Sequence, residues 1–365
     1  MIVSAVSQVA DVGALLSREL AARLEVVDIL SRKMLSGRMQ GERRSKRRGR
    51  SVEFDDYRQY LPGDDPRHLD WNVLARLDKL VIKLFQEEED LCLDVLVDCS
   101  ASMHSADVMP ALGAAQTARA TSKLLFAAQL ACALGAIGLS NNNRVSVTLF
   151  GAKFGGATGS PVVSSVARPL VRLQPLRGRG STSRLVGFVR DFAFVPPSAA
   201  GAGGAEAMDM AVRAILGGAR GGRGVLVVIS DFLMPAGGEG VAGYTQVLRA
   251  LGAAAGGGGG SAGRMGIDPY LLVVHTPQER DVAALARPGG LLAGDVRLTD
   301  VESGRAAEVT MGEAAVRGYQ QRSAEHWKQL SSASSRAGVS LVTLPTDLDP
   351  ASVVLGLLRA RGLLG

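Results

Sequence analysis

The fold is decided by the stretch Val95-Leu96-Val97-Asp98-Cys99-Ser100-Ala101-Ser102-Met103. Its apolar first part is typical of a buried strand, and a carboxylate, that of Asp98, stands where the strand gives way to a loop. The hydroxyls of Ser100 and Ser102 follow at alternate positions. Because Mg²⁺ prefers oxygen ligands in near-octahedral geometry and keeps several waters, these three side chains indicate one half of a magnesium site.

Around this stretch, the sequence from residue 91 onward alternates between short apolar runs and longer helical patterns. The strand-like runs are 91–98, 143–150, 163–171, 224–230, 269–275 and 339–344, and the helix-like runs are 110–139, 183–194, 205–218, 240–253, 311–336 and 350–362. This alternation predicts an α/β fold whose mostly parallel central sheet is flanked by helices. Alternating residues near 295–310 predict a β-hairpin inserted between a strand and a helix.

Two further oxygen donors stand at comparable places in the sequence. Thr182 follows a glycine-rich loop and precedes a helix, and Asp231 follows the apolar run 225–230. Because parallel sheets bind ligands at the carboxyl ends of their strands, these donors complete a predicted metal site of Asp98, Ser100, Ser102, Thr182 and Asp231. Both Mg²⁺ and Mn²⁺ suit such ligands. The structural alternative is a loop held by Asx and serine turns.

This constellation resembles the metal-ion-dependent adhesion site (MIDAS) of von Willebrand factor A-type (vWA) domains, which has a D-x-S-x-S motif, a distant Thr and a later Asp. The resemblance implies a Rossmann-like fold in which Ser100 and Ser102 bind the metal directly. It implies direct or water-mediated contact for Thr182 and contact through water for Asp98 and Asp231. A carboxylate of a partner protein would fill the open position. The sequence departs from the pattern at Ser181 and Phe232, where glycine is common.

Residues 49–90 resemble the signature of the bacterial domain-of-unknown-function 58 (DUF58) family. The matching residues are Gly49–Phe54, Asp56–Arg58, Tyr60–Arg67, Leu69–Trp71, Ala75-Arg76 and Glu87–Asp90. The resemblance implies a partnership with a MoxR-type AAA+ ATPase in chaperone-like maturation or assembly of protein complexes. It implies no settled biochemical activity.

These patterns divide the chain at residue 90. We expect a vWA-like domain over 91–365. Residues 1–90 would contribute an amphipathic helix over 10–35, a basic segment and the signature segment, all packed on the main domain rather than forming a separate one. Trp71 is predicted to anchor this packing as a core side chain. The charged residues of the signature segment are interpreted as a structural network of ion pairs and turns.

The basic character of the chain comes from one short segment. Residues 38–50 hold seven Lys and Arg against one acid, so this segment alone has the formal net charge of the whole chain, +6. We expect a solvated linker, or ion pairs with the acids at 87–90. Nucleic-acid binding through 38–50 is an alternative, but the segment lacks the aromatic residues that stack on bases.

The remaining patterns favour a cytoplasmic location. The three cysteines form no C-x-x-C pair, which is typical of free thiols in a reducing compartment. No basic region precedes an apolar run at the N-terminus, so no signal peptide is expected. The apolar stretch Leu124–Leu139 is shorter than the roughly 20 residues of a membrane span and is predicted to be a core helix. Peripheral membrane association stays open.

The sequence therefore predicts a metal-dependent protein-binding module and not an enzyme. A metal-dependent hydrolase that uses a Mg²⁺-activated water is the alternative, and it would need a general base. His104 and His275 are the histidines expected near the proposed site, and neither is paired with an obvious nucleophile. The chain contains no G-x-x-x-x-G-K-[ST] motif, so ATP hydrolysis by a P-loop is not expected.

Overall fold

The structure is a computed structural model that describes most of the chain. The described residues are 12–30, 54–61, 64, 66–85, 91–104, 122–154, 168–195, 204–218, 224–233, 240–255, 266–280, 282–286, 292, 294–302 and 304–365. The chain divides into two compact units, one of residues 1–36 with 91–365 and one of residues 37–90. Residues 1–36 belong to the main unit and residues 37–90 form the other. The predicted division into residues 1–90, packed on the main domain, and a vWA-like domain over 91–365 stays a prediction.

A six-stranded sheet forms the centre of the main unit, in the order β10-β7-β6-β3-β4-β5. Its strands are β3 (Cys92–Asp98), β4 (Arg144–Phe154), β5 (Arg168–Arg172), β6 (Gly224–Ser230), β7 (Ile267–His275) and β10 (Ser340–Pro345). All neighbouring strands are parallel except β4 and β5. The prediction of a mostly parallel sheet is confirmed, and the strand expected over 163–171 is the antiparallel edge strand β5.

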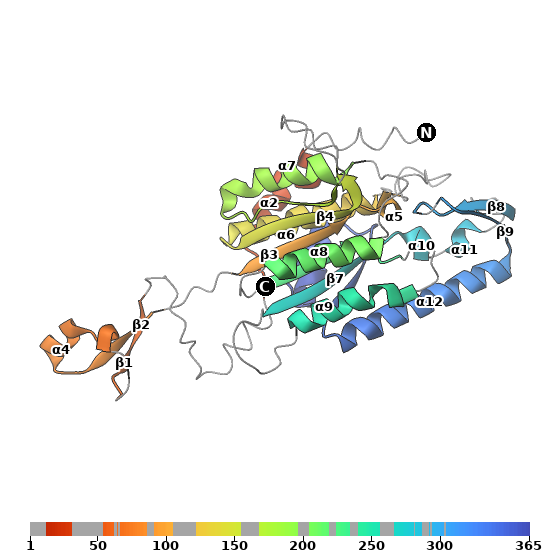
Figure 1. The fold of residues 1–365 in the computed structure, drawn as a ribbon. Helices are drawn as coiled ribbons and strands as arrows, with labels where there is room; N and C mark the ends of the chain where they lie inside the picture. Colours follow the sequence, from red (N-terminus) through yellow and green to blue (C-terminus); the bar gives the residue numbers. More distant parts are fainter. Residues whose placement is uncertain are drawn as a thin grey trace. The chain divides into compact units, whose positions relative to one another are not determined.

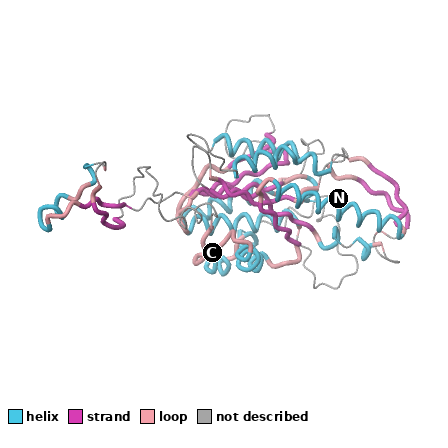
Figure 2. The backbone as a smooth tube through the Cα atoms, turned by 90° about the horizontal axis from the view of Figure 1, so that it is seen from below, coloured by secondary structure: helices cyan, strands magenta, loops and turns pink. Residues whose placement is uncertain are grey.

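Helices cover both faces of this sheet (Figures 1 and 2). One face packs against α1 (Val12–Leu15), α2 (Arg18–Leu24), α6 (Lys123–Ser140), α7 (Thr182–Ala193) and the C-terminal turns α13 (Pro350–Ser352) and η6 (Val353–Leu358). The other packs against α8 (Gly204–Gly218), η5 (Gly240–Tyr244), α9 (Thr245–Ala255) and α12 (Glu313–Arg336). Val95 and Val97 point into the first core and Leu96 into the second. Burial on both faces explains why these strands are continuous apolar runs.

Helix α6 is the helix that the sequence predicts for the core. By length and composition it could cross a membrane, but 83% of it is buried inside the structure. The helix expected over 10–35 is shorter than predicted. Ser17 begins a new helix because its side chain accepts the Leu20 N–H, and that helix ends at Leu24. Ile29 then forms an isolated bridge with Leu364.

The unit of residues 37–90 contains an antiparallel pair of strands, β1 (Phe54–Gln59) and β2 (Val81–Phe85), the turn η2 (Pro66–His68) and α4 (Trp71–Leu77). Arg58 and Asp64 form an ion pair of 2.7 Å, as the interpretation of a structural network expects. Trp71 is 64% exposed, so it is not a core side chain of its own unit, and its predicted role in packing on the main unit stays a prediction. It is the first residue of α4, and the preceding Asp70 is buried as the helix cap. Packing of this unit on the main one stays a prediction.

The predicted hairpin is present as β8 (Gly294–Thr299) and β9 (Ala306–Met311), a separate two-stranded sheet. Three short helices complete the described elements: α5 (Ala101–His104), α10 (Pro277–Arg280) and α11 (Val282–Leu285). The basic segment 38–50 lies outside the described residues, as do residues 256–265 of the glycine-rich stretch.

Candidate metal centre

The candidate site lies where the order of the strands in the sheet reverses, between β3 and β6. From β3 the chain leads through α6 to β4 on one side, whereas from β6 it leads to β7 and β10 on the other. Ligands of open α/β sheets bind outside the carboxyl ends of the strands at such a switch point. Asp98 is the last residue of β3, and Asp231 directly follows β6. The topology therefore brings the two aspartates to the same crevice.

Both carboxylate oxygens of Asp98 accept hydrogen bonds. Oδ1 accepts the backbone N–H of Ser100 at 2.9 Å, and Oδ2 accepts the hydroxyl of Ser230 at 2.6 Å. Ser100 Oγ lies 3.1 Å from Ser102 Oγ, and these residues are all buried. The Asp98–Ser100 bond is the Asx turn of the structural alternative. The sequence prediction does not include Ser230. Its position directly before Asp231 is the sequence feature that could have indicated its role.

Gly151 in β4 makes room for this arrangement. Its φ is +86°, a conformation that L side chains rarely adopt. A Cβ at this position would lie 2.8 Å from Asp98 Oδ1 and 3.0 Å from Ser100 N. Any side chain here would therefore displace the carboxylate and the loop that follows it.

Asp231 contacts a cation supplied by the chain itself. Lys123, the first residue of α6, is fully buried, and its Nζ donates to Asp231 Oδ2 at 2.9 Å and to Glu279 Oε1 at 2.6 Å. The other oxygen of Asp231 accepts the Leu233 N–H at 3.1 Å. Sequence reasoning missed Lys123 and Glu279. The sequence feature that could have indicated Lys123 is its position as a single lysine directly before the apolar stretch Leu124–Leu139.

The electrostatics of the site show an excess of negative charge. The pKa of Asp98 is raised to about 7, mainly by burial and also by the charge of Asp231, while hydrogen bonds from Ser230 and Ser100 oppose the shift. Burial alone would lower the pKa of Lys123, but Asp231 and Glu279 raise it overall, so the lysine stays charged. Within the described residues, Lys123 is the only cation that forms an ion pair with any of these carboxylates.

A fourth carboxylate reaches the site from the β8–β9 hairpin. Glu302 in the hairpin turn accepts the backbone N–H of Ser102 with Oε1 at 2.8 Å. Burial raises the pKa of Tyr244, and the charges of Asp231, Asp98 and Glu302 raise it further. These four side chains therefore lie close enough to interact. Sequence reasoning missed Glu302, and nothing in the local sequence of the hairpin indicates this contact.

The loop after Asp231 has an unusual backbone. Phe232 is buried and has a φ of +51°, and its ring packs edge-on against Tyr244 with 5.4 Å between ring centroids. The left-handed conformation costs an L residue about 1–2 kcal/mol, which explains why glycine suits this position in the pattern that the sequence resembles. His326 Nε2 lies 3.1 Å from the Phe232 carbonyl, which can accept only, so the ring nitrogen donates.

The structure joins four of the five predicted residues. Hydrogen bonds connect Asp98, Ser100 and Ser102, and Asp231 interacts electrostatically with Asp98. Thr182 begins α7, and its hydroxyl donates to the Arg179 carbonyl at 2.9 Å, within its own turn. Its membership of the site stays a prediction. No group of three or more His, Cys, Asp or Glu residues suited to a metal ion occurs in the described part of the chain.

The donors present nevertheless fit a hard divalent cation. Hydroxyl and carboxylate oxygens are the ligands that Mg²⁺ and Mn²⁺ prefer, and Ser100, Ser102, Asp98 and Asp231 supply only such atoms. The pKa of Asp98 is raised by burial and by the charge of Asp231, and a bound cation would oppose both effects. The four residues could therefore hold a metal ion.

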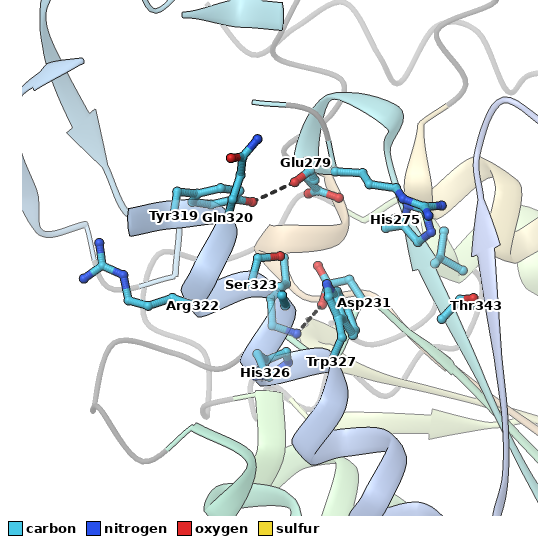
Figure 3. Close-up of a pocket in the computed structure, with 14 residues that line it drawn as sticks. Asp231, His275, Glu279, Tyr319, Gln320, Arg322, Ser323, His326, Trp327 and Thr343 are labelled. Atoms are coloured by element: carbon cyan, nitrogen blue, oxygen red, sulfur yellow. Dashed lines mark hydrogen bonds between the residues drawn. The ribbon is translucent and has the colours of Figure 1, made fainter. Parts of the chain in front are cut away.

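A cavity of about 540 Å³ adjoins the site and shares Asp231 with it (Figure 3). It lies at the carboxyl ends of β6, β7 and β10. Helix α12 forms one wall and the first residues after β7 form another. His275 also lines this cavity, and burial lowers the pKa of its imidazole. Burial lowers the pKa of His104 to about 4. In the described residues, no hydrogen bond joins either imidazole to the four site residues.

Comparisons with known proteins give a family but no activity. Residues 56–255 match the model of the family described as "Protein of unknown function DUF58". Proteins described as uncharacterized from Mycobacterium bovis and Mycobacterium tuberculosis are 26% identical over 331 residues, which is 91% of this chain and 86% of theirs. The crystal structure of an aerotolerance-related membrane protein from Bacteroides fragilis covers 74% of this chain and 97% of its own, at 13% identity and a TM-score of 0.34. A similarity that low supports no conclusion about fold or function.

Proposed function

The chain belongs to the DUF58 family, and from that premise we propose that it is a metal-dependent protein-binding module with a MIDAS-type site. The site would hold Mg²⁺ or Mn²⁺ through Ser100, Ser102, Asp98 and Asp231, with Thr182 as a fifth donor. The bound cation would supply a positive centre for an acidic side chain of a partner protein. The finer fold is proposed to be the Rossmann-like vWA fold, whose ligand crevice lies at such a switch point.

The observation that carries this proposal is the pair of buried aspartates. Asp98 and Asp231 are 3% and 2% exposed, and burial together with the charge of Asp231 raises the pKa of Asp98 to about 7. Two like charges held together in a buried site favour a cation or a proton between them. A divalent cation would relieve the repulsion and lower that pKa.

The contact of Glu302 supports a carboxylate as the group that a partner protein would place at the site. Its oxygen already accepts the N–H of Ser102, whose side chain is a proposed ligand. A carboxylate therefore fits beside the proposed metal position without distortion of the loop. A partner's Asp or Glu would approach from the same side and compete with Glu302.

We propose a MoxR-type AAA+ ATPase as the partner, with the pair acting in chaperone-like maturation or assembly of protein complexes in the cytoplasm. The support is the family membership and the resemblance of residues 49–90 to the family signature. The hydrolase alternative would need a general base, and among the described residues neither His104 nor His275 is hydrogen-bonded to the four site residues. Nucleic-acid binding through 38–50 falls on residues outside those described.

Calorimetry with MgCl₂ tests the metal site. Wild-type protein should bind one Mg²⁺ per chain, and Asp98→Ala should lose that binding while its circular dichroism spectrum is retained. Unchanged affinity in Asp98→Ala would exclude the site. A second experiment tests the partner: a purified MoxR-type ATPase from the same genome should be captured in Mg²⁺ and released by EDTA. Metal-independent capture would show that the site is not the contact.

A further inference from the structure

The cavity beside the proposed metal centre shares one residue with it. Asp231 lines the cavity and also belongs to the proposed metal site, and Glu279 lines the cavity and shares Lys123 with Asp231. A volume of about 540 Å³ lies within the range of small-ligand pockets, roughly 300–1,000 Å³. It leaves room for a large side chain with part of the neighbouring peptide.

Part of the cavity wall is apolar, and its aromatic portion is held in place. Leu233, Val274 and Trp327 contribute apolar surface. The Trp327 indole meets the His326 ring edge-on with 5.1 Å between centroids, and His326 in turn donates to the Phe232 carbonyl. Figure 3 shows His326 and Trp327 side by side on α12, next to Asp231. An aromatic wall fixed in this way is typical of the pockets that dominate binding energy at protein interfaces.

The charges around the cavity are unequal. Its carboxylates, Asp231 and Glu279, are engaged by Lys123. Arg280 and Arg322 also line it and are exposed, and among the described residues neither forms an ion pair with a carboxylate. Arg322 extends outward from α12, away from Asp231 (Figure 3). The positive charge that remains available to a partner therefore lies at the rim, and it complements acidic residues.

We propose that this cavity binds an aromatic side chain of the partner, next to the acidic residue that the metal centre holds, and that Arg280 and Arg322 contact further acidic residues. This inference rests on the proposed function of the metal centre and names the chemistry of its partner. The recognised segment is a short acidic peptide stretch with one aromatic residue within a few positions of the metal-bound Asp or Glu. The metal contact would provide metal dependence, and the cavity would select among acidic sequences.

Peptide selection tests the inference directly. A phage-displayed library of random dodecapeptides is selected on the full-length protein in MgCl₂, and bound phage are eluted with EDTA. Wild-type protein should enrich peptides that combine an acidic residue with a nearby aromatic one. Trp327→Ala should still enrich acidic peptides but lose the aromatic preference. The exposed Trp71 lies in the other unit, so Trp71→Ala provides the matched control and should select the same peptides as wild type.

A second variant distinguishes loss of the cavity contact from a folding defect in Trp327→Ala. Ser323→Trp places a bulky side chain in the cavity without removing any wall, and it should abolish the aromatic preference in the same way. For one enriched peptide, anisotropy should show about tenfold weaker binding to Trp327→Ala, or on replacement of the peptide's aromatic residue by Ala. The two changes together should weaken binding no further, because each removes the same contact.

The outcomes separate the two proposals. Mg²⁺-dependent acidic peptides without an aromatic preference would refute the cavity proposal and leave the metal centre standing. An aromatic preference that survives in both Trp327→Ala and Ser323→Trp would also refute it. No Mg²⁺-dependent enrichment by wild-type protein would refute the metal-dependent function together with the inference that rests on it.

Discussion

At the scale of single residues, Asp98 ties stability to pH. The pKa of Asp98 is raised in the folded protein to about 7 from 3.8, so between pH 4 and 7 the folded state holds a proton that the unfolded state has released. The contribution of Asp98 to the free energy of unfolding therefore falls as the pH rises through that window. At pH 8 the buried carboxylate is ionised, and its destabilising effect is fully present.

Asp98→Asn should remove the destabilisation caused by the ionised, buried carboxylate of Asp98. In EDTA at pH 8, its melting temperature should exceed that of wild type by several degrees, and the difference should shrink as the pH falls toward 4. Added Mg²⁺ should raise the melting temperature of wild type but not of Asp98→Asn. Differential scanning fluorimetry measures both effects. The exposed Asp191 provides a control, because Asp191→Asn should change neither. A melting temperature of Asp98→Asn equal to wild type at pH 8 would contradict the argument.

Lys123 gives a second prediction at this scale. Lys123→Met should lower the free energy of unfolding by about 3 kcal/mol or more, because it leaves Asp231 buried without its partner. Mg²⁺ should bind more tightly to this variant than to wild type, since the crevice becomes more negative. Urea titrations with and without Mg²⁺ measure both effects, and Lys153→Met at an exposed position of β4 is the control. Weaker Mg²⁺ binding by Lys123→Met would argue that the lysine supports the metal instead of competing with it.

At the scale of elements, the β8–β9 hairpin is predicted to restrain access to the site. Glu302→Ala removes the carboxylate that contacts Ser102, so a Mg²⁺-dependent acidic peptide should bind several-fold more tightly. Fluorescence anisotropy with a labelled peptide measures the change. Glu308→Ala, on an exposed position of the same hairpin, should leave the affinity unchanged. Weaker peptide binding by Glu302→Ala would mean that Glu302 stabilises the site for its partner.

The elements also show what the sequence could and could not predict. The strands ending at Asp98 and Asp231 were predictable, because burial on both faces makes each a continuous apolar run. The hairpin was predictable from its alternation. In place of the single helix predicted over 10–35, the described residues form two short helices that Ser17 separates, and the second ends at Leu24 although the apolar spacing continues. The contacts of Ser102 with Glu302 and of Asp231 with Lys123 span 200 and 108 residues, and no local pattern reports such pairs.

At the scale of the whole molecule, the two units should respond differently to metal. Every described residue of the proposed site belongs to the unit of residues 1–36 and 91–365. Hydrogen exchange followed by mass spectrometry should therefore show slower exchange in Mg²⁺ for peptides covering 98–104 and 230–233. Peptides covering 54–61 and 71–85 should exchange at the same rate with and without Mg²⁺. Equal protection of both sets would mean that metal binding changes the unit of residues 37–90 as well.

The buried lysine at the start of α6 has a consequence for how the protein is made. Structural zinc sites fold only when the ion arrives, because their ligands have no other partner. Here the chain brings a cation of its own to Asp231, so a newly synthesised molecule can complete its core before any ion is available. Binding of a metal ion at the proposed site would then be a late and reversible event. Such a protein could stay folded in its metal-free state, and it would bind its partner when the ion is supplied.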